Sequence, residues 1–259
     1  MRTHVNSVPV LAYHSISREG GPTSIAPETF RMQMDVLAEC GFASMTCGDF
    51  LHWHSGPDAV ATNRVLITFD DAYADFATEA FPILRERSFS SLVFVPTGKI
   101  GKHEDWQGAN APARALMTWS TVRDLAAAGV EFGGHGVSHT DLTRLTPALR
   151  RREIEHCAHE LAARIGRPVR SFAAPYGHVN RVVLADIAVT YEVAFGTRLE
   201  RVFPKRDRFD IPRIEMHYFR NAGRWRDFIL GEELYFRLRH ALRGVRAAAN
   251  RVWPRGIGD

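Results

Sequence analysis

The stretch VLITFDDAYADF, residues 65–76, sets five apolar or β-branched residues directly before two adjacent aspartates. A continuous run of this kind is typical of a parallel strand that is covered on both faces. Asp70 and Asp71 then follow its carboxyl end, where open α/β sheets and barrels place their active sites. A lone aspartate here would be read as the cap of a helix beginning near Ala72. Two adjacent carboxylates repel each other, so we expect a cation to hold one while the other accepts a proton.

Apolar runs alternate with amphipathic stretches along most of the 259 residues, which predicts one domain with a parallel sheet and crossover helices. The eight expected strands, a number typical of a barrel, cover 8–13, 42–46, 65–69, 91–95, 130–134, 171–174, 193–196 and a short piece near 211–214. The expected helices cover about 27–40, 73–87, 119–128, 146–165 and 179–189. We assign residues 1–231 to the barrel and 232–259 to a C-terminal basic helix and tail attached to the same domain.

The cysteines and the N-terminus bear on the cellular compartment. Cys40, Cys47 and Cys157 form no C-x-x-C pair, and their odd number argues against a disulfide framework. The N-terminus lacks the pattern of a signal peptide, and no stretch approaches the ~18 apolar residues of a membrane span. We therefore expect a cytoplasmic protein without a signal peptide, either free or peripheral at the inner membrane face.

Positive charge is concentrated at the C-terminal end. Residues 201–259 carry 14 Lys or Arg against 7 Asp or Glu, which leaves the first 200 residues with a net charge of −3. There Leu234, Leu238, Leu242 and Val245 recur at helical spacing between arginines. Such an apolar stripe either packs on the domain or contacts an anionic membrane surface or a polyanionic substrate. Nucleic acid is not expected as a partner, because no recognition motif is present.

A second group of polar residues follows the expected strand at 130–134. His135 and His139 in HGVSH are four residues apart, close enough for both imidazoles to reach one ion. Gly136 occupies the place of the glutamate in H-E-x-x-H, which excludes that metalloprotease motif. Together with Asp71 the histidines form a set that suits Zn²⁺, Fe²⁺, Co²⁺ or Ni²⁺. Non-haem iron oxygenases share this set, but the alternation of strands and helices argues against their all-β scaffold.

A turn at the end of another expected strand completes the pattern. The phrases TFDDA at 68–72, HGVSH at 135–139 and AAPYG at 173–177 resemble, in this order, the three motifs of the polysaccharide deacetylase family, also called the NodB-homology or carbohydrate esterase family four. The resemblance extends over roughly residues 8–215, through LAYHSI, MTWSTVRDLAAAGVEFGGH and DIPRIE, and particularly to the branch acting on N-acetylated exopolysaccharides and envelope glycans.

This resemblance implies a single distorted (β/α) barrel of about seven or eight strands that removes acetyl groups from an acetylated oligo- or polysaccharide. It implies one divalent metal ion, zinc before Fe, Co or Ni, with Asp71, His135 and His139 as its ligands. Asp70 is implied as the catalytic base, and Tyr176 as the donor of a backbone N–H to the oxyanion. The expected substrate contacts are Pro175, Tyr176 and Trp119.

The chain departs from the family pattern at three places. Ala72 replaces the usual glycine, which restricts the turn at positive φ. Ala173 occupies the place of an arginine that orients the base in many members, and we expect Arg213 in DIPRIE to replace it. The late Leu-x-His phrase that supplies the general acid is missing, so we expect His14 to act as the acid, with His217 as its rival.

The expected reaction is hydrolysis of an acetamide by a water whose pKa the metal lowers toward about 7, with Asp70 as the acceptor of its proton. An O-acetyl esterase could use the same site, because metal and water do not distinguish an ester from an amide. A catalytically inactive, glycan-binding member of the family is the other alternative, supported by Ala72 and Ala173.

Overall fold

The structure, a computed structural model, describes residues 6–19, 23–56, 62–106, 113–232, 234–239 and 241–242. The strands in these ranges are β1 (Val10–Tyr13), β2 (Ser15–Ile16), β3 (Ser24–Ile25), β4 (Ala43–Ser44), β5 (Arg64–Phe69), β6 (Leu92–Val95), β7 (Glu131–Gly134), β8 (Ser171–Ala173), β9 (Val193–Phe195) and β10 (Ile214–Glu215). The α-helices are α1 (Pro27–Glu39), α2 (Cys47–Ser55), α3 (Phe81–Glu86), α4 (Trp119–Ala127), α5 (Pro147–Ile165), α6 (Arg181–Thr190) and α7 (Ala222–Ile229). A π-helix covers Phe76–Ala80, and short 3₁₀ turns cover Thr97–Lys99, Leu142–Arg144, Pro175–Gly177 and Met216–Tyr218.

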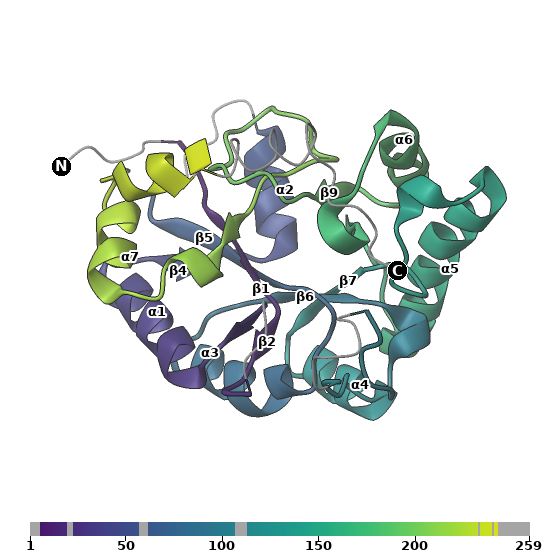
Figure 1. Cartoon of the computed structure of the whole chain (residues 1–259), viewed down its shortest axis with the longest axis horizontal. Helices are drawn as coiled ribbons and strands as arrows, with labels where there is room; N and C mark the ends of the chain where they lie inside the picture. Colours follow the sequence, from purple (N-terminus) through teal and green to yellow (C-terminus); the bar gives the residue numbers. More distant parts are fainter. Residues whose placement is uncertain are drawn as a thin grey trace, which may run out of the picture.

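Seven parallel strands form a curled sheet in the order β10-β1-β5-β6-β7-β8-β9, and β4 pairs with β5 outside this path (Figure 1). An isolated parallel bridge between Phe195 and Ile211 links β9 to the segment that leads into β10. The sheet therefore curls into a half-barrel, which confirms the predicted distorted (β/α) barrel of seven or eight strands. Parallel pairing brings the carboxyl ends of all these strands to the same end of the barrel.

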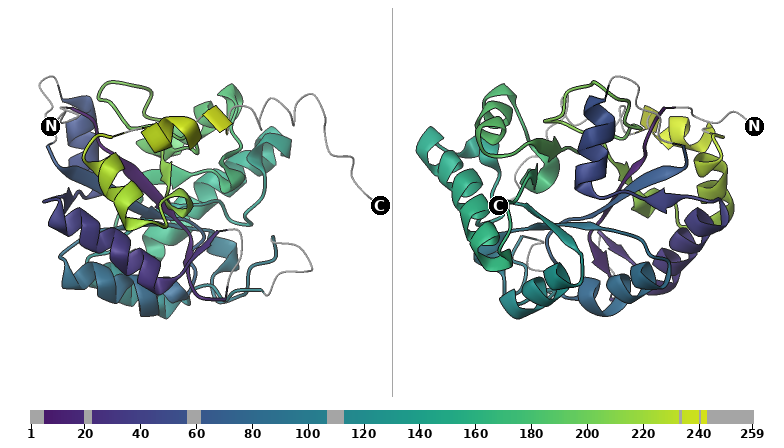
Figure 2. Two further views of the ribbon diagram at one scale, coloured as in Figure 1. Left: turned by 60° about the vertical axis from the view of Figure 1, so that its left-hand side comes forward. Right: turned by 180° about the vertical axis from the view of Figure 1, so that it is seen from behind.

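The strands bury both of their faces, as the continuous apolar runs predict. Leu11 and Tyr13 of β1 belong to the core cluster under the helices, whereas Val10 belongs to a second cluster inside the half-barrel. The outer helices surround the sheet, as the two further views in Figure 2 show. Helix α2 contributes Phe50 and Trp53 to the inner cluster. The inside of the half-barrel is therefore filled with side chains and is not a pore.

The helices differ from the expectation at three places. Helix α2 was not predicted, although Thr46 and Asp49 form the capping box that opens it. Helix α7 was not predicted either, although Asn221 caps its first turn. The helix expected over 73–87 is a π-helix followed by α3, because a left-handed turn at 71–72 delays its start.

The strand predictions agree more closely with the structure. Seven of the eight expected strands coincide with observed ones to within two residues, and the eighth begins at Ile214 rather than near Ile211. Helix α1 begins with Pro27 and is followed by Gly41 at φ 73°, as its sequence signals indicate. Within the described ranges, no helix is both long and apolar enough to cross a bilayer. The proposed division at residue 231 and the cellular location stay predictions.

Candidate metal and catalytic site

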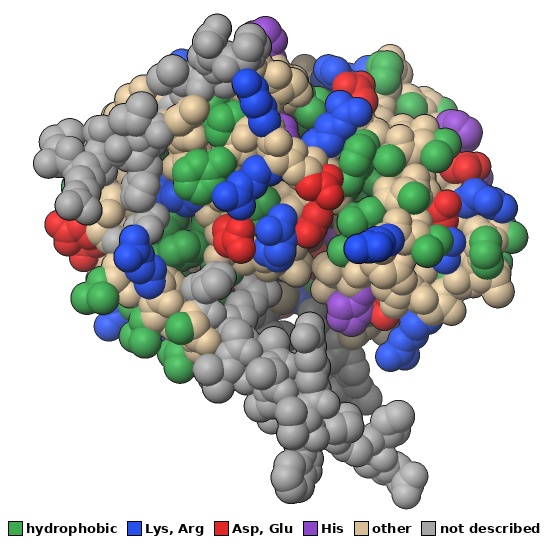
Figure 3. All heavy atoms as spheres, turned by 90° about the horizontal axis from the view of Figure 1, so that it is seen from above, with side chains coloured by type: hydrophobic (Ala, Val, Ile, Leu, Met, Phe, Trp, Pro, Cys, Tyr) green, Lys and Arg blue, Asp and Glu red, His purple; other side chains and the backbone are tan. Residues whose placement is uncertain are grey.

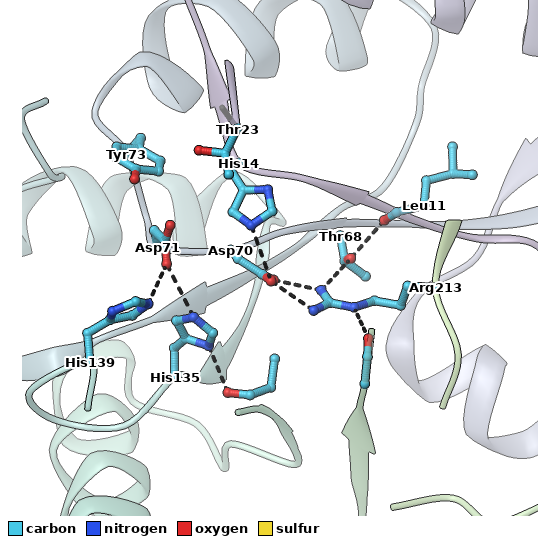
Figure 4. A network of polar contacts seen from close by, with 12 residues as sticks. Leu11, His14, Thr23, Thr68, Asp70, Asp71, Tyr73, His135, His139 and Arg213 are labelled. Atoms are coloured by element: carbon cyan, nitrogen blue, oxygen red, sulfur yellow. Dashed lines mark hydrogen bonds and ion pairs between the residues drawn. The ribbon is translucent and has the colours of Figure 1, made fainter. Parts of the chain in front are cut away.

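The carboxyl ends of the strands carry the polar residues that the sequence singled out. Asp70 and Asp71 follow β5, and His135 and His139 follow β7. Together with His14 after β1, they line a pocket of about 360 Å³. Figure 4 shows these side chains converging from different strands on one small volume. The structure thus brings together residues that are separated by more than one hundred positions in the sequence.

Asp71, His135 and His139 form a compact group with the composition of a metal site. All three are buried, and each offers a ligand atom within 4.8 Å of the other two. The Nε2 atoms of His135 and His139 lie 3.2 and 3.1 Å from Asp71 Oδ1. That oxygen is buried and lacks a hydrogen bond of good geometry among the described residues. A buried carboxylate oxygen facing two imidazole nitrogens fits a divalent cation bound between them.

The electrostatics of this group favour the ionised form of Asp71, which a bound cation requires. Burial by itself would raise the pKa of Asp71, but the imidazoles of His135 and His139 hold it well below its usual range. Burial lowers the pKa of His139, which favours the neutral imidazole that a metal requires. Burial would also lower the pKa of His135, but Asp71 and Asp70 raise it, because these carboxylates attract positive charge. His135 is oriented by its Nδ1, which lies 2.7 Å from the carbonyl oxygen of Ala173, so its Nε2 faces the same volume as that of His139.

The loop between the two histidines is held by Glu153 of α5, a residue that the sequence analysis missed. Its carboxylate accepts hydrogen bonds from the backbone N–H groups of Val137 and Ser138, at 2.7 and 2.8 Å. It also accepts the hydroxyl of Ser138 at 2.8 Å. Gly136 lies so close to this carboxylate that a Cβ there would come within 3.2 Å of Oε2. Glu153 is 14 residues from His139 on another element, so the motif spacing carried no signal for it.

Backbone strain is concentrated at the same site. Asp71, Ala72, His139 and Tyr176 have φ values of 74°, 56°, 56° and 61°, the left-handed region that non-glycine residues rarely adopt. The alanine that replaces the family's glycine therefore does occupy a position with positive φ. Strain of this kind persists where the surrounding structure imposes it, and it is commonly found at functional sites.

Asp70 is held by Arg213, which the sequence analysis named as the replacement for the arginine missing at position 173. Arg213 donates from Nη1 and Nη2 to the two carboxylate oxygens of Asp70, at 2.6 and 2.8 Å, while its Nε donates to the Gly196 carbonyl at 2.8 Å (Figure 4). Both members of this pair are almost completely buried. Burial would raise the pKa of Asp70, but the Arg213 guanidinium outweighs it and lowers that pKa. Asp70 is therefore fixed and ionised beside Asp71.

The two histidines considered as the general acid lie in different places. His14 lines the pocket, and its Nε2 lies 3.9 Å from Asp70 Oδ2. His217 is exposed on the 3₁₀ turn after β10 and has its Nδ1 2.9 Å from Arg220 Nη2. It does not belong to the described residues that line the pocket. His14 is therefore placed where a general acid could act in this pocket, and His217 is not.

The aromatic walls of the pocket differ in part from the expectation. Tyr176 lines it with 48% of its surface exposed, and its ring centroid lies 4.8 Å from that of His139. Trp106, which the sequence analysis missed, also lines the pocket and stacks on the His139 ring with centroids 4.0 Å apart. Trp106 lies between the 3₁₀ turn Thr97–Lys99 and α4, in a connection rich in glycine and charged residues, and this composition was the available signal.

Two of the expected substrate contacts lie elsewhere. Trp119 begins α4, packs against the core and has the Arg164 guanidinium 4.9 Å from its ring centroid. Pro175 is buried beside Gly136, under the loop that carries the histidines. Neither lines the pocket among the described residues. Their apolar surfaces are used in packing, so the prediction that they contact substrate gains no support here and stays a prediction.

Comparison with known proteins places this site in a family. The polysaccharide deacetylase family matches residues 58–193, just over half of the chain, including Asp70, Asp71, His135, His139 and Tyr176 within that range. The Bacillus subtilis protein YxkH is 27% identical over 148 residues, which cover 57% of this chain and 48% of that protein. The poly-β-1,6-N-acetyl-D-glucosamine N-deacetylase of Escherichia coli is 23% identical over 247 residues, covering 81% of this chain and 36% of the enzyme. The chain therefore spans half or less of the length of these relatives.

Solved structures support the fold independently. IcaB from Ammonifex degensii superposes with a TM-score of 0.74 at 22% identity, covering 88% of this chain and 97% of IcaB. The Streptococcus pyogenes deacetylase PplD, solved in complex with acetate, gives a TM-score of 0.71 at 23% identity, covering 81% of this chain and 92% of PplD. At this level of identity the likeness establishes the curled barrel alone. The match over residues 58–193 carries the assignment further: this chain belongs to the polysaccharide deacetylase family.

Proposed function

We propose that this protein is a metal-dependent N-deacetylase that hydrolyses the acetamide groups of an N-acetylated polysaccharide or envelope glycan. The observation that carries the proposal is the pairing of two differently held carboxylates in one pocket. Asp71 faces two imidazoles, as a metal ligand would, whereas Asp70 is held ionised by Arg213 and faces the same space. One carboxylate can thus bind an ion while its neighbour accepts a proton.

The metal is proposed to be zinc, with iron, cobalt and nickel as alternatives that the same ligands accept. Asp71, His135 and His139 would hold it. When bound, such an ion acidifies a water molecule and polarises the acetyl carbonyl. The remaining groups of the reaction come from the chain itself.

Asp70 is proposed to take the proton of the attacking water, since Arg213 keeps its carboxylate ionised and correctly turned. His14, which lines the same pocket, would donate a proton to the departing amine. The backbone N–H of Tyr176 would stabilise the negative charge that develops on the acetyl oxygen. The exposed face of Tyr176 and the stacked ring of Trp106 would contact the sugar. The products are acetate and a free amino sugar.

N-deacetylation is preferred to O-deacetylation because His14 is available as an acid, which an amine leaving group needs more than an alkoxide. The named activity of the Escherichia coli relative, on an N-acetylglucosamine polymer, supports the same choice. The inactive alternative rested on Ala72 and Ala173. Arg213 holds Asp70 although residue 173 is an alanine, and both aspartates line the pocket despite Ala72, which supports an active site.

The test measures acetate release together with bound metal. The protein is first stripped with a chelator and then reloaded with zinc, and each form is assayed on N-acetylglucosamine oligosaccharides and on O-acetylated xylo-oligosaccharides. We expect activity only after reloading and mainly on the N-acetylated substrate. Release from the O-acetylated substrate alone would identify an esterase, and stoichiometric zinc without any release would identify a binding protein.

A further inference from the structure

A row of leucines at the C-terminal end of the described chain faces solvent. Residues 234–239 and 241–242 are helical, and Leu234, Leu238 and Leu242 recur there at intervals of four. Together with Leu230, just after α7, their side chains are 46–85% exposed, with Leu234 the most exposed at 85%. Several large apolar side chains exposed along one face mark an interaction surface rather than scattered surface residues. We refer to Leu234, Leu238 and Leu242 as the leucine row.

The opposite side of this helical segment is attached to the domain. Phe236 is 8% exposed, and its ring centroid lies 4.8 Å from that of Phe228 in α7. The Tyr235 hydroxyl donates to the carbonyl oxygen of Tyr218 at 2.9 Å. The alternative that the stripe packs on the domain is therefore wrong for Leu234, Leu238 and Leu242, whereas Val245 lies outside the described residues. The aromatic side chains occupy that contact, which leaves the leucine row outward.

The charge of the segment indicates what the leucine row binds. Residues 234–258 contain six arginines and no aspartate or glutamate. A second copy of the chain would bring two such segments together with mutual repulsion. A surface with a high density of negative charge would instead attract each arginine, by about 1 kcal/mol for each one near an anionic bilayer. Figure 3 shows hydrophobic and basic side chains next to one another on the left of the molecule, with acidic side chains nearby.

The residue that anchors this segment is close in sequence to a residue of the pocket wall. Tyr218, whose carbonyl holds Tyr235, follows the pocket-lining Glu215 by three residues. We propose that the leucine row inserts into the interface of an anionic lipid membrane, which the basic composition of this end of the chain favours over a neutral one. Amphipathic helices with an apolar face and basic flanks bind membranes in this manner. The proposal concerns membrane binding and does not depend on the deacetylase activity.

The test is sedimentation of the full chain with vesicles. Vesicles of phosphatidylcholine with phosphatidylglycerol are compared with vesicles of phosphatidylcholine alone, at low and high salt. The wild-type protein should bind the anionic vesicles, and salt should weaken this binding because it screens the arginines. The double variant L234D/L238D should bind at least about tenfold more weakly, since it loses two inserted leucines. Both positions are exposed, so its thermal unfolding should match that of the wild type.

The matched control is V182D/V189D, which alters two residues of α6 that are 55% and 82% exposed and lie outside the arginine-rich segment. It should bind anionic vesicles like the wild type. The proposal would be overturned if L234D/L238D and V182D/V189D bound anionic vesicles equally well. It would also be overturned if the wild type bound neutral and anionic vesicles equally well. Self-association of the wild type in analytical ultracentrifugation that L234D/L238D abolishes would instead assign the leucine row to a second copy. Acetate release from soluble oligosaccharides should be the same in all three proteins, which separates this test from that of the proposed activity.

Discussion

Removal of Arg213 should be costly for both stability and catalysis, because it leaves the buried carboxylate of Asp70 without its counter-charge. Arg213 is 3% exposed and makes two hydrogen bonds to Asp70, one to the Gly196 carbonyl and one to the Thr68 hydroxyl at 3.2 Å. Breaking a buried ion pair by removing one partner costs about 3–5 kcal/mol. Arg213→Ala should therefore lower the free energy of unfolding by about this amount.

The catalytic loss should follow from the same change. Without Arg213 the Asp70 carboxylate loses the two hydrogen bonds that fix it, and burial then raises its pKa. A misplaced or protonated base should reduce kcat by about 10²- to 10⁴-fold, the usual contribution of general acid–base catalysis. Arg213→Lys keeps the charge but cannot make the two parallel hydrogen bonds, so its loss should be intermediate. Metal content should remain stoichiometric in both variants, since Arg213 is hydrogen-bonded to none of the three expected ligands.

The assay combines urea unfolding, acetate release and metal analysis. Arg198→Ala is the matched control, because Arg198 also pairs with an aspartate, Asp210, at 2.8 Å but is 46% exposed. Such a pair contributes at most about 1 kcal/mol. The double variant D70N/R213A should be more stable than the sum of the single effects predicts, because the change at position 70 removes the buried charge that Arg213 balances.

An unfolding free energy of Arg213→Ala equal to that of Arg198→Ala, together with wild-type turnover, would refute this reasoning. It would mean that Asp70 depends on the guanidinium neither for its ionisation nor for its position.

Four further predictions concern single side chains. His139→Ala should lose the bound divalent ion while remaining folded, and stoichiometric metal in the variant would remove His139 from the ligand set. Glu153→Gln should weaken metal affinity by about 10- to 100-fold in titration calorimetry, because the loop between the ligands loses its charged acceptor. Glu155→Gln on the same helix is the control. Equal metal affinities of the two variants would contradict the role of Glu153. Trp106→Ala should raise KM for oligosaccharides by about 2- to 10-fold with kcat nearly constant, and an unchanged KM would separate its ring from the substrate. His14→Ala should slow acetate release from an acetamide more than from an activated acetyl ester, and equal losses would argue against its role as the acid.

The position of the site along the chain could be predicted from sequence because it depends on local patterns. The apolar run at 65–69 places Asp70 and Asp71 at the end of β5, and the spacing of His135 and His139 brings both into one loop after β7. Strand periodicity is a local property that survives in the fold, since each strand must be covered on both faces. The family motifs add the roles of these residues and, through the missing arginine, the expectation for Arg213.

Contacts between distant segments could be decided only by the tertiary structure. Sequence spacing does not show that Glu153 accepts three hydrogen bonds from the histidine loop, or that Trp106 rather than Trp119 reaches the pocket. It also offered the leucine row as a packing face, whereas Phe236 makes the contact with the domain. Helical periodicity shows which residues share a face, but the choice of the buried face depends on what lies opposite. Here an aromatic cluster around Phe228 accepts the aromatic side, and the leucines are left exposed.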